Sequence, residues 1–332
     1  MIVDLRSDTV TRPTPAMRAA MAAAELGDDV FGDDPTVNRL QAYVAERCGF
    51  EAALWFPSGT QSNLSALMSH CGRGDEYLVG QEAHTYRYEA GGAAVLGSIQ
   101  PQPLPNLADG SIALTELEAA IKPDDPHFAR TRLIALENTI GGRVLPLAYM
   151  RDVQALARRR GLALHLDGAR AFNAAVALGA DIREVCRGFD SVSLCLSKGL
   201  GAPAGSVLCG PRAFIECARR CRKILGGGMR QVGLLAAAGL YALEHHVARL
   251  ATDHAHAEEL AHGLAAAGYE VTPTRTNMVF MEAPPGFAAH CAQRGIVLLD
   301  GARLRLVTHL DVTAPGIGQA LHAARQFRTR PR

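Results

Sequence analysis

Near its middle the chain reads Leu164-His165-Leu166-Asp167-Gly168-Ala169-Arg170. An apolar run that ends in an acid and a glycine, followed by a helix-forming stretch, is typical of a buried strand that leads into a helix. Ligands of open parallel sheets bind at the carboxyl ends of the strands, so Asp167 is expected at a ligand site. A buried carboxylate must be paired, and a pyridinium nitrogen is a suitable partner.

A second strand-like run lies further along the chain and reads Ser191-Val192-Ser193-Leu194-Cys195-Leu196-Ser197-Lys198-Gly199. A lysine that follows a strand is a candidate to form a Schiff base with a carbonyl cofactor. By itself Lys198 could be an ordinary surface lysine. Pyridoxal phosphate (PLP) enzymes, however, need both a lysine and an acid for the ring nitrogen, and Asp167 ends the preceding strand candidate. The two residues together therefore indicate PLP.

A weaker signal is Phe56-Pro57-Ser58-Gly59-Thr60, where a strand ends in small hydroxylated residues and a helix begins. Backbone N–H groups at a helix start attract phosphate. Any capped helix could look the same, and the stretch has neither a Walker A lysine nor the glycines of a dinucleotide site.

Short apolar runs alternate with helical ones in the first two thirds of the chain, which predicts an α/β domain with a mainly parallel sheet. Strands are expected at residues 52–56, 76–79, 94–97, 133–136, 163–166, 191–196 and 206–209, and helices at 63–70 and 147–160. One long helical run is expected from 232 to about 266. Short strands at 269–272, 278–281, 297–299 and 304–308 and a helix at 317–327 should follow it. This change predicts a large domain at 1–240 and a small α+β domain at 241–332.

Composition excludes several classes of protein. Lys plus Arg (34) nearly balance Asp plus Glu (33), which leaves no basic excess for a nucleic acid. No secretory signal or membrane span is apparent. The eight cysteines include no CxxC pair, and no histidine lies beside them at zinc-ligand spacing, so reduced thiols and no metal are expected. These features favour a cytoplasmic enzyme.

The sequence also resembles a known family, the low-specificity L-threonine aldolases, which are fold-type-I PLP enzymes of the β-eliminating lyase group. The resemblance runs in order from Asp4 to about Val312. The segments that carry it are Leu5-Arg6-Ser7-Asp8-Thr9-Val10-Thr11, Gly27-Asp28-Asp29-Val30-Phe31-Gly32-Asp33-Asp34-Pro35-Thr36, Glu82-Ala83-His84, Glu89-Ala90-Gly91-Gly92, Asp167-Gly168-Ala169-Arg170, Ser197-Lys198-Gly199-Leu200-Gly201-Ala202-Pro203, Gly226-Gly227-Gly228-Met229-Arg230-Gln231 and Arg305-Leu306-Val307-Thr308-His309.

The resemblance implies an aspartate-aminotransferase-like fold and an aldehyde-lyase of amino-acid metabolism. Such an enzyme cleaves L-threonine or L-allo-threonine reversibly to glycine and acetaldehyde. It also implies a homotetramer built from dimers that share active sites. The resemblance also implies roles for single residues. Lys198 carries PLP, Asp167 pairs with the ring nitrogen of PLP, His84 stacks on the ring, and Gly59 and Thr60 bind the phosphate. The substrate carboxylate is held by Ser7, Arg170 and Arg305, and the cofactor region of a neighbouring subunit is reached by Lys223 and Arg230.

Two departures from the family pattern affect the expected chemistry. Many relatives have a histidine where this chain has Ile140, and an isoleucine can neither accept a proton nor hydrogen-bond an alcohol. We hypothesise that His84, directly or through water, is the base, and that Ile140 makes its side of the pocket apolar. The other departure is Phe31, where relatives often carry tyrosine.

Three alternatives remain open from sequence alone. One is a phenylserine aldolase, another is a β-eliminating PLP lyase, and the third is a protein without catalytic activity on the same scaffold. His165 could support Asp167 or simply be packed, and a structural role is expected for His309.

Overall fold

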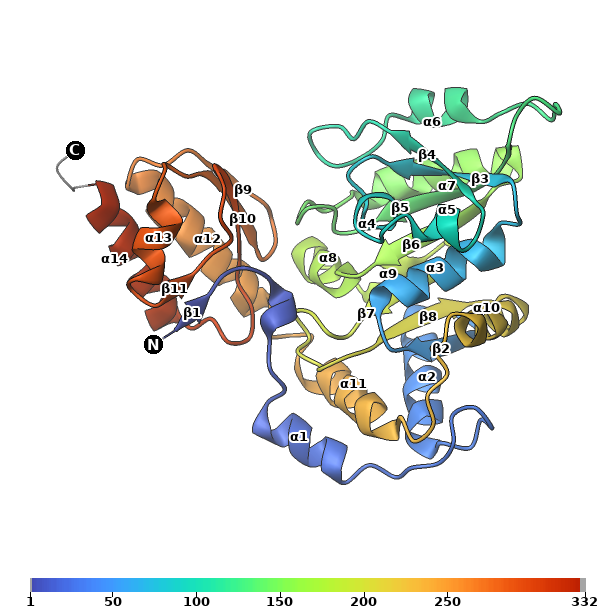
Figure 1. Cartoon of the computed structure of the whole chain (residues 1–332), viewed down its shortest axis with the longest axis horizontal. Helices are drawn as coiled ribbons and strands as arrows, with labels where there is room; N and C mark the ends of the chain where they lie inside the picture. The colour runs from blue at the N-terminus through green and yellow to red at the C-terminus, as the bar shows by residue number, and fades with distance from the viewer. Residues whose placement is uncertain (1, 329–332) are drawn as a thin grey trace.

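A computed structural model gives the fold and describes residues 2–328. The large part of the molecule is a seven-stranded sheet in the order β2-β8-β7-β6-β5-β3-β4 (Figure 1). All neighbours are parallel except β8, which is antiparallel to both β2 and β7. Its strands are β2 (Ala52–Phe56), β3 (Asp75–Gly80), β4 (Gln100–Leu104), β5 (Arg130–Glu137), β6 (Ala163–Gly168), β7 (Ser191–Cys195) and β8 (Ser206–Gly210). The predicted α/β class and mainly parallel sheet are confirmed.

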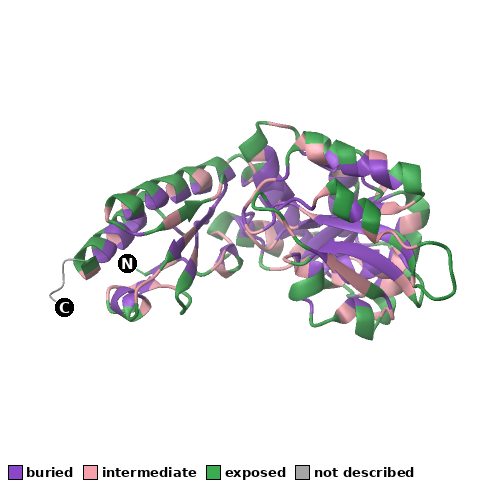
Figure 2. Ribbon diagram, turned by 90° about the horizontal axis from the view of Figure 1, so that it is seen from above, coloured by how far each residue is buried: buried purple, intermediate pink, exposed green. Residues whose placement is uncertain are grey.

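Helices cover both faces of this sheet. In the large part they are α1 (Pro15–Ala22), α2 (Pro35–Cys48), α3 (Gly59–His70), α4 (His84–Arg87), α5 (Gly92–Val95), α6 (Leu114–Ala120), α7 (Leu147–Arg160), α8 (Ala171–Leu178), α9 (Ile182–Cys186), α10 (Arg212–Ile224) and α11 (Gly233–His245). Figure 2 shows the strands buried and the outer sides of the helices exposed. The sheet therefore lies at the centre of the largest apolar cluster.

The C-terminal part is a smaller α+β unit. It contains α12 (Leu250–Ala266), β9 (Val271–Pro273), β10 (Met278–Glu282), α13 (Phe287–Ala292), β11 (Ile296–Val297), β12 (Arg303–Val307) and α14 (Ala314–Arg328). The order β12-β10-β9 forms an antiparallel sheet, and β11 pairs in parallel with β1 (Val3–Asp4) at the start of the chain. Val3 and Leu5 therefore pack in the small apolar cluster, whereas Leu250 still belongs to the large one. The division expected at residue 240 stays a prediction.

Two predicted elements are wrong, and one strand was not predicted. Residues 94–97 are not a strand, because Gly92–Val95 forms one helical turn, α5, that begins after Gly91 in the left-handed region (φ 68°). The edge strand β4 was not predicted, because its two prolines are unusual in a strand. They are tolerated here because an edge strand needs fewer backbone N–H donors. The long helix expected from residue 232 to 266 is two helices, α11 and α12, separated after His245.

Candidate active site

Acidic and basic side chains meet at the carboxyl ends of neighbouring strands. Asp167 lies near the end of β6 and pairs in register with Glu137, the last residue of β5. Lys198 follows β7, the next strand of the sheet. In Figure 1 this edge, with α4 and α8, faces the small C-terminal part. The fold therefore brings Asp167 and Lys198 to one edge, as the sequence predicted.

Asp167 is buried and held in one orientation. Its side chain is 2% exposed, Oδ2 accepts a hydrogen bond from Asn63 Nδ2 at 2.8 Å, and Oδ1 accepts one from the Ala169 N–H at 3.0 Å. Both carboxylate oxygens are therefore held by hydrogen-bond donors. A carboxylate fixed in this way is suited to pair with the nitrogen of a bound ring.

Lys198 differs from the other two lysines of the chain. Lys122 donates to Glu76 at 3.3 Å and to Gln102, and Lys223 is exposed on α10. Lys198 is half-buried, and within residues 2–328 its ammonium group makes no hydrogen bond or salt bridge. Its backbone carbonyl accepts from Thr11 Oγ1 at 3.1 Å, which fixes the main chain and leaves the amine available.

His84 stands next to a buried carboxylate. Nδ1 of His84 lies 2.9 Å from Glu89 Oε1, which also accepts from Asn63 Nδ2 at 3.0 Å. This hydrogen bond to Glu89 raises the pKa of His84, and the charge of Asp167 acts in the same direction. Burial raises the pKa of Glu89, and the hydrogen bond from His84 lowers it. When Glu89 is ionised it only accepts, so Nδ1 then carries the hydrogen and Nε2 keeps its lone pair. Glu89 thus selects the tautomer of His84 that can accept a proton.

The amide of Asn63 joins the two carboxylates. Oxygen and nitrogen ligand atoms of His84, Glu89 and Asp167 lie within 4.8 Å of one another, a spacing that a metal ion could also use. Here the two amide hydrogens of Asn63 occupy the positions between Glu89 and Asp167. Asn63 Oδ1 in turn lies 3.3 Å from Nε2 of His165. His165 thus supports Asp167 through Asn63, and burial lowers the pKa of His165 to about 3, so it is neutral.

Glu137 is a titratable group beside the same site. Its Oε2 accepts the backbone N–H of His84 at 2.7 Å. Burial, and next the negative charge of Asp167, raise the pKa of Glu137 to about 7. Glu137 therefore changes its charge near neutral pH, directly opposite Asp167 in the sheet.

Two arginines supply positive charge on the side of the small C-terminal part. Arg170 is bound side-on by the buried carboxylate of Asp8, with Nε–Oδ2 at 2.8 Å and a terminal nitrogen to Oδ1 at 2.6 Å. Although burial would raise the pKa of Asp8, Arg170, followed by Lys198 and Asn277, holds it at about 2. Asp8 therefore already occupies the N–H donors on one side of the Arg170 guanidinium group. Only the donors on its other side are left for a substrate.

Arg305 is the less neutralised of the two arginines. Its Nε is buried and has no hydrogen-bond partner within residues 2–328, and a terminal nitrogen donates to the Arg6 carbonyl at 3.3 Å. Burial, and next the charge of Arg170, lower the pKa of Arg305. A planar cation with free donors is suited to a carboxylate. Ser7 lies nearby in sequence to Arg6 and Asp8, and its Oγ accepts from the N–H and hydroxyl of Thr9.

The start of α3 has the features of a phosphate site. Ser58 caps the helix by accepting from the Gln61 N–H at 3.2 Å, and Gly59 and Thr60 form the first turn. A Cβ added to Gly59 would lie 3.4 Å from Ser206 Oγ, which is buried without a hydrogen-bond partner in the described chain. This orphaned hydroxyl, the helix N-terminus, the free amine of Lys198 and the fixed carboxylate of Asp167 together fit PLP.

The end of α10, with Lys223, and the loop that follows it, with Arg230, lie beside the same helix start. Gln61 Nε2 donates to the Leu225 carbonyl at 3.0 Å, and Gly227 is packed against the Gln61 side chain. Lys223 is exposed, and Arg230 is half-exposed and pairs with Asp28 at 3.1 Å. The loop thus approaches the start of α3 in its own chain, where the phosphate is expected. The predicted reach of Lys223 and Arg230 toward a neighbouring subunit stays a prediction.

Ile140 lines a small cavity together with Ala83 and Glu137, and the hypothesis that it makes its side of the pocket apolar stays a prediction. Ile140 is 3% exposed and packs in the core cluster, where its side chain fills the space beside Gly110. An aliphatic side chain is stabilised there by burial rather than by a substrate. Phe31, the other departure, is 81% exposed.

Sequence reasoning missed four residues at this edge: Asp8, Asn63, Glu89 and Glu137. Asp8 and Glu89 lie inside segments that carried the family resemblance, and Glu137 directly follows the predicted strand 133–136, so position was an available signal. Nothing in the sequence marked Asn63, because its role arises from contacts with residues far away in the chain. His309 has the structural role expected, since its Nε2 lies 2.8 Å from the Asp4 carbonyl.

Comparisons with known proteins agree with this geometry. The family model of the β-eliminating lyases matches residues 4–284. The low-specificity L-threonine aldolase of Escherichia coli (strain K12) is 54% identical over 99% of this chain and 100% of its own length. Among solved structures, Leishmania major threonine aldolase has a TM-score of 0.86 at 21% identity and covers 98% of this chain and 100% of its own. Serine palmitoyltransferase from S. paucimobilis, with bound PLP-myriocin aldimine, has a TM-score of 0.76 at 18% identity, over 98% and 87% of the two chains.

The fold is thus that of the type I PLP enzymes, and PLP is the cofactor of this group. The chain belongs to the β-eliminating lyase family and, within it, to the low-specificity L-threonine aldolases.

Proposed function

We propose that the protein cleaves L-threonine, L-allo-threonine or related β-hydroxy-α-amino acids to glycine and an aldehyde. The observation that carries the proposal is that Lys198 and the fixed carboxylate of Asp167 lie at one sheet edge. Among residues 2–328 the Lys198 amine has no hydrogen-bond or salt-bridge partner. When bound, PLP withdraws electrons from the amino acid as its Cα–Cβ bond breaks. The membership of the chain in the threonine aldolase family gives the reaction type.

Arginine side chains are proposed to hold the substrate by its carboxylate. Arg305 offers the buried donor without a partner, and Arg170 offers the edge that Asp8 leaves free. Ser7 supplies a hydroxyl from the same N-terminal segment. Fixing the carboxylate selects which bond at Cα stands perpendicular to the cofactor ring, and this selection distinguishes an aldolase from other enzymes of the same fold.

His84 is proposed as the base that takes the proton of the β-hydroxyl group. Glu89 holds the hydrogen on Nδ1, and within residues 2–328 Nε2 of His84 makes no hydrogen bond. Ile140 cannot take this role, because it is aliphatic and buried in the core. Thr60 and Gly59 would bind the phosphate through backbone N–H groups at the start of α3.

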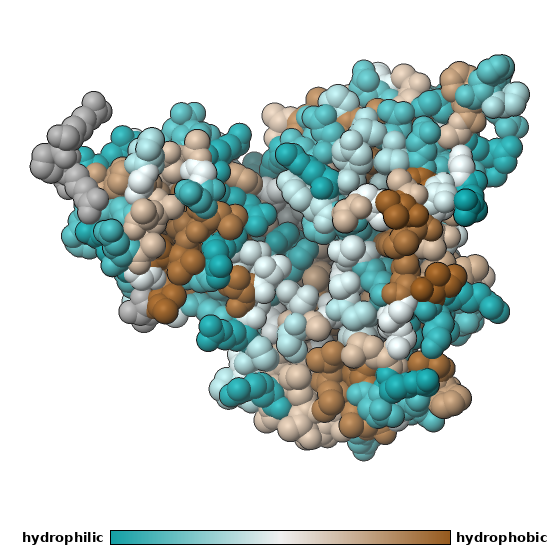
Figure 3. Space-filling model, viewed as in Figure 1, coloured by the Kyte–Doolittle hydropathy of each residue, from teal (hydrophilic) through white to brown (hydrophobic). Residues whose placement is uncertain are grey.

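An oligomer is proposed as well, with a homotetramer as the form implied by the family resemblance. Large apolar side chains are exposed in or beside two loops. Val30 and Phe31 follow Asp28 and Asp29 in the first loop, and Ile224 and Met229 flank the three glycines 226–228 in the second. The two loops are adjacent, because the Asp29 N–H donates to the Arg230 carbonyl at 3.2 Å. Figure 3 shows apolar patches on the large part of the molecule. Exposed patches of this kind mark interaction surfaces.

A cytoplasmic location is also proposed, supported by the eight free cysteines. Within the described residues, each helix is either too short or too polar to traverse a lipid bilayer.

The direct test of the function is product analysis with the PLP-loaded protein. We expect both L-threonine and L-allo-threonine to be cleaved, and each to give one molecule of acetaldehyde for every molecule of glycine. Phenylserine serves as the comparison substrate and should give glycine and benzaldehyde if the β-substituent site is open. A keto acid and ammonia would instead identify a β-eliminating lyase and overturn the proposal. A visible spectrum unchanged by added PLP would mean that the scaffold does not use the cofactor.

Glu89→Gln is expected to lower kcat by about 10-fold and to move the acidic limb of its pH profile to lower pH. The neutral imidazole is the active form, so kcat falls as pH falls through the pKa of His84. Glu89 raises that pKa by its hydrogen bond, and glutamine keeps the acceptor oxygen but removes the charge. The matched control is Glu82→Gln, because Glu82 pairs with Arg143 instead. An unshifted acidic limb in Glu89→Gln would exclude His84 as the base.

A further inference from the structure

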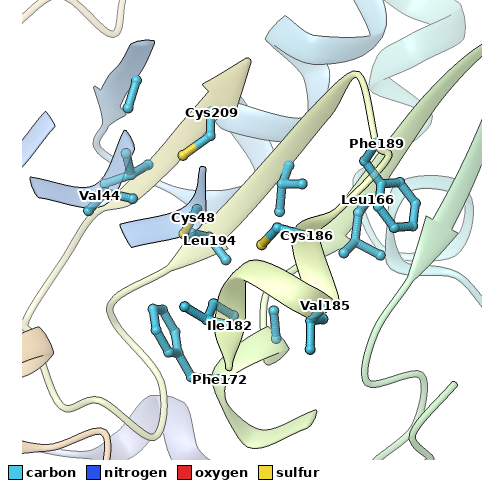
Figure 4. Packing of buried hydrophobic residues seen from close by; sticks show 14 of the residues in the cluster. Val44, Cys48, Leu166, Phe172, Ile182, Val185, Cys186, Phe189, Leu194 and Cys209 are labelled. Atoms are coloured by element: carbon cyan, nitrogen blue, oxygen red, sulfur yellow. The ribbon is translucent and has the colours of Figure 1, made fainter. Parts of the chain in front are cut away.

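Three thiols lie together in the core of the large part of the molecule, away from the active site. Cys48 is the last residue of α2, Cys186 is the last residue of α9, and Cys209 is in β8. They are 3%, 1% and 0% exposed, respectively. Figure 4 shows them among apolar side chains such as Val44, Ile182 and Leu194. α2 packs against both α9 and β8, so the three sulfur atoms come from elements in direct contact.

Cys48 is the centre of this group. The side chains of Cys186 and Cys209 are the neighbours that act most strongly on the pKa of the Cys48 thiol. Two S–H donors stabilise a thiolate between them, as donors do for any buried anion. The hydrogen bond with Cys186, then that with Cys209, lower the pKa of Cys48, while the pKa values of both partners rise. The arrangement therefore favours a thiolate at Cys48 over one at either partner.

A surface cavity borders two of the three cysteines. It has a volume of about 410 Å³ and is lined by Cys48 and Cys186, with Arg183, Arg187 and Asp190 around them. Cys209 does not line it. Asp190 directly precedes β7, so the cavity lies at the opposite end of that strand from Lys198. A small molecule in this cavity would thus lie beside Cys48 and Cys186 and away from the active site.

The other buried cysteines lack these features. Burial raises the pKa of Cys71 to about 12 and that of Cys291 to about 11. Cys195 lies within 3.4 Å of the Ser197 hydroxyl, and no second thiol hydrogen-bonds to it among the described residues. Thiolate character and access govern oxidation, so Cys48 stands apart among the buried thiols.

We propose that Cys48 and Cys186 form a thiol pair that a small hydroperoxide oxidises reversibly to a disulfide. The Cys48 thiolate attacks the O–O bond, which breaks to give a sulfenic acid at Cys48, and the leaving alkoxide or hydroxide takes up a proton. The Cys186 thiol then attacks the sulfenic sulfur, a disulfide forms, and water leaves. Two thiols are thus oxidised by two electrons and one peroxide is reduced. Cys209 acts as the donor that keeps Cys48 ionised.

The test is oxidation of the native, PLP-loaded protein with hydrogen peroxide over a time course, followed by alkylation in denaturant and tryptic mapping. The three cysteines fall in separate tryptic peptides, at residues 48–73, 184–187 and 199–212. We expect a linked peptide that joins 48–73 to 184–187, assigned to Cys48 rather than Cys71 by fragmentation. Loss of free Cys48 should be at least about tenfold faster than loss of free Cys195. A thiol reductant should restore both residues.

Variants separate the roles of the three thiols. In Cys186→Ala the sulfenic acid at Cys48 should persist and be trapped by dimedone, and in Cys209→Ala oxidation of Cys48 should slow. Cys195→Ala is the matched control, because it removes a buried thiol outside the group. The proposal is overturned if the wild-type protein is oxidised only at the exposed Cys217, or if Cys48 and Cys195 oxidise at the same rate. The wild-type measurement decides the question even if a core variant fails to fold.

Discussion

Lys198→Ala is expected to abolish aldol cleavage, with kcat reduced by about three orders of magnitude or more. The ammonium group of Lys198 makes no hydrogen bond or salt bridge within residues 2–328, so its only apparent use is covalent attachment of the cofactor. For the same reason the free energy of unfolding should change by less than about 1 kcal/mol. The measurements are the steady-state rate with L-threonine and the visible spectrum of the protein after PLP is added.

The small number of lysines makes this test sharp. Lys122→Ala is the matched control, because Lys122 is occupied by Glu76 and Gln102 in the same domain. Borohydride reduction of the loaded protein should label one peptide only, the one that contains Lys198. A label on Lys122 or Lys223, or full activity in Lys198→Ala, would contradict the proposed site.

Asp167→Asn is expected to lower kcat by roughly 100-fold and to change the titration of its neighbours. The amide of the new side chain would place a donor against the Asn63 amide, which now donates to Asp167 at 2.8 Å. Asp167 raises the pKa of both His84 and Glu137, so removing its charge should lower both pKa values. NMR titration of the cofactor-free protein measures this shift independently of activity.

Asp190→Asn provides the control for this substitution. Asp190 precedes β7 at the other end of the sheet, and its Oδ2 accepts the Leu164 N–H at 2.7 Å. An asparagine there can still accept that hydrogen bond, so activity and the titration of His84 should stay unchanged. Equal effects of the two substitutions would show that Asp167 acts through general stability and not at the site.

The strands of the large sheet could be predicted because most are buried on both faces, which produces continuous apolar runs such as Leu133–Leu136. The edge strand β4 could not, since its sequence alternates proline with glutamine and it is exposed or half-buried over its first four residues. Short apolar runs are ambiguous, and residues 94–97 are an example, where the run begins inside a helical turn. The break between α11 and α12 carries no glycine or proline to mark it.

The residues of the candidate site also fall into two groups, those that the sequence could reveal and those that only the fold reveals. Asp167 and Lys198 could be found because each follows a strand, and parallel strands bring such positions to one edge. Arg170 was assigned to the substrate, but its side-on pairing with Asp8 depends on an N-terminal segment that only the fold brings there. Asn63 is an ordinary polar residue in a helix, and its two hydrogen bonds become visible only when three elements meet.

The pairing of β1 with β11 affects how this protein can be completed during synthesis. Val3 is synthesised 293 residues before its partner Ile296. At roughly 5–20 residues per second the N-terminal segment must wait tens of seconds for that partner. The seven-stranded sheet can form in the meantime, and Asp8 can reach Arg170 from a fixed position only afterwards. A nascent chain that stalls before β11 would therefore have Lys198 in place. The N-terminal segment that places Asp8 against Arg170 would not yet be fixed.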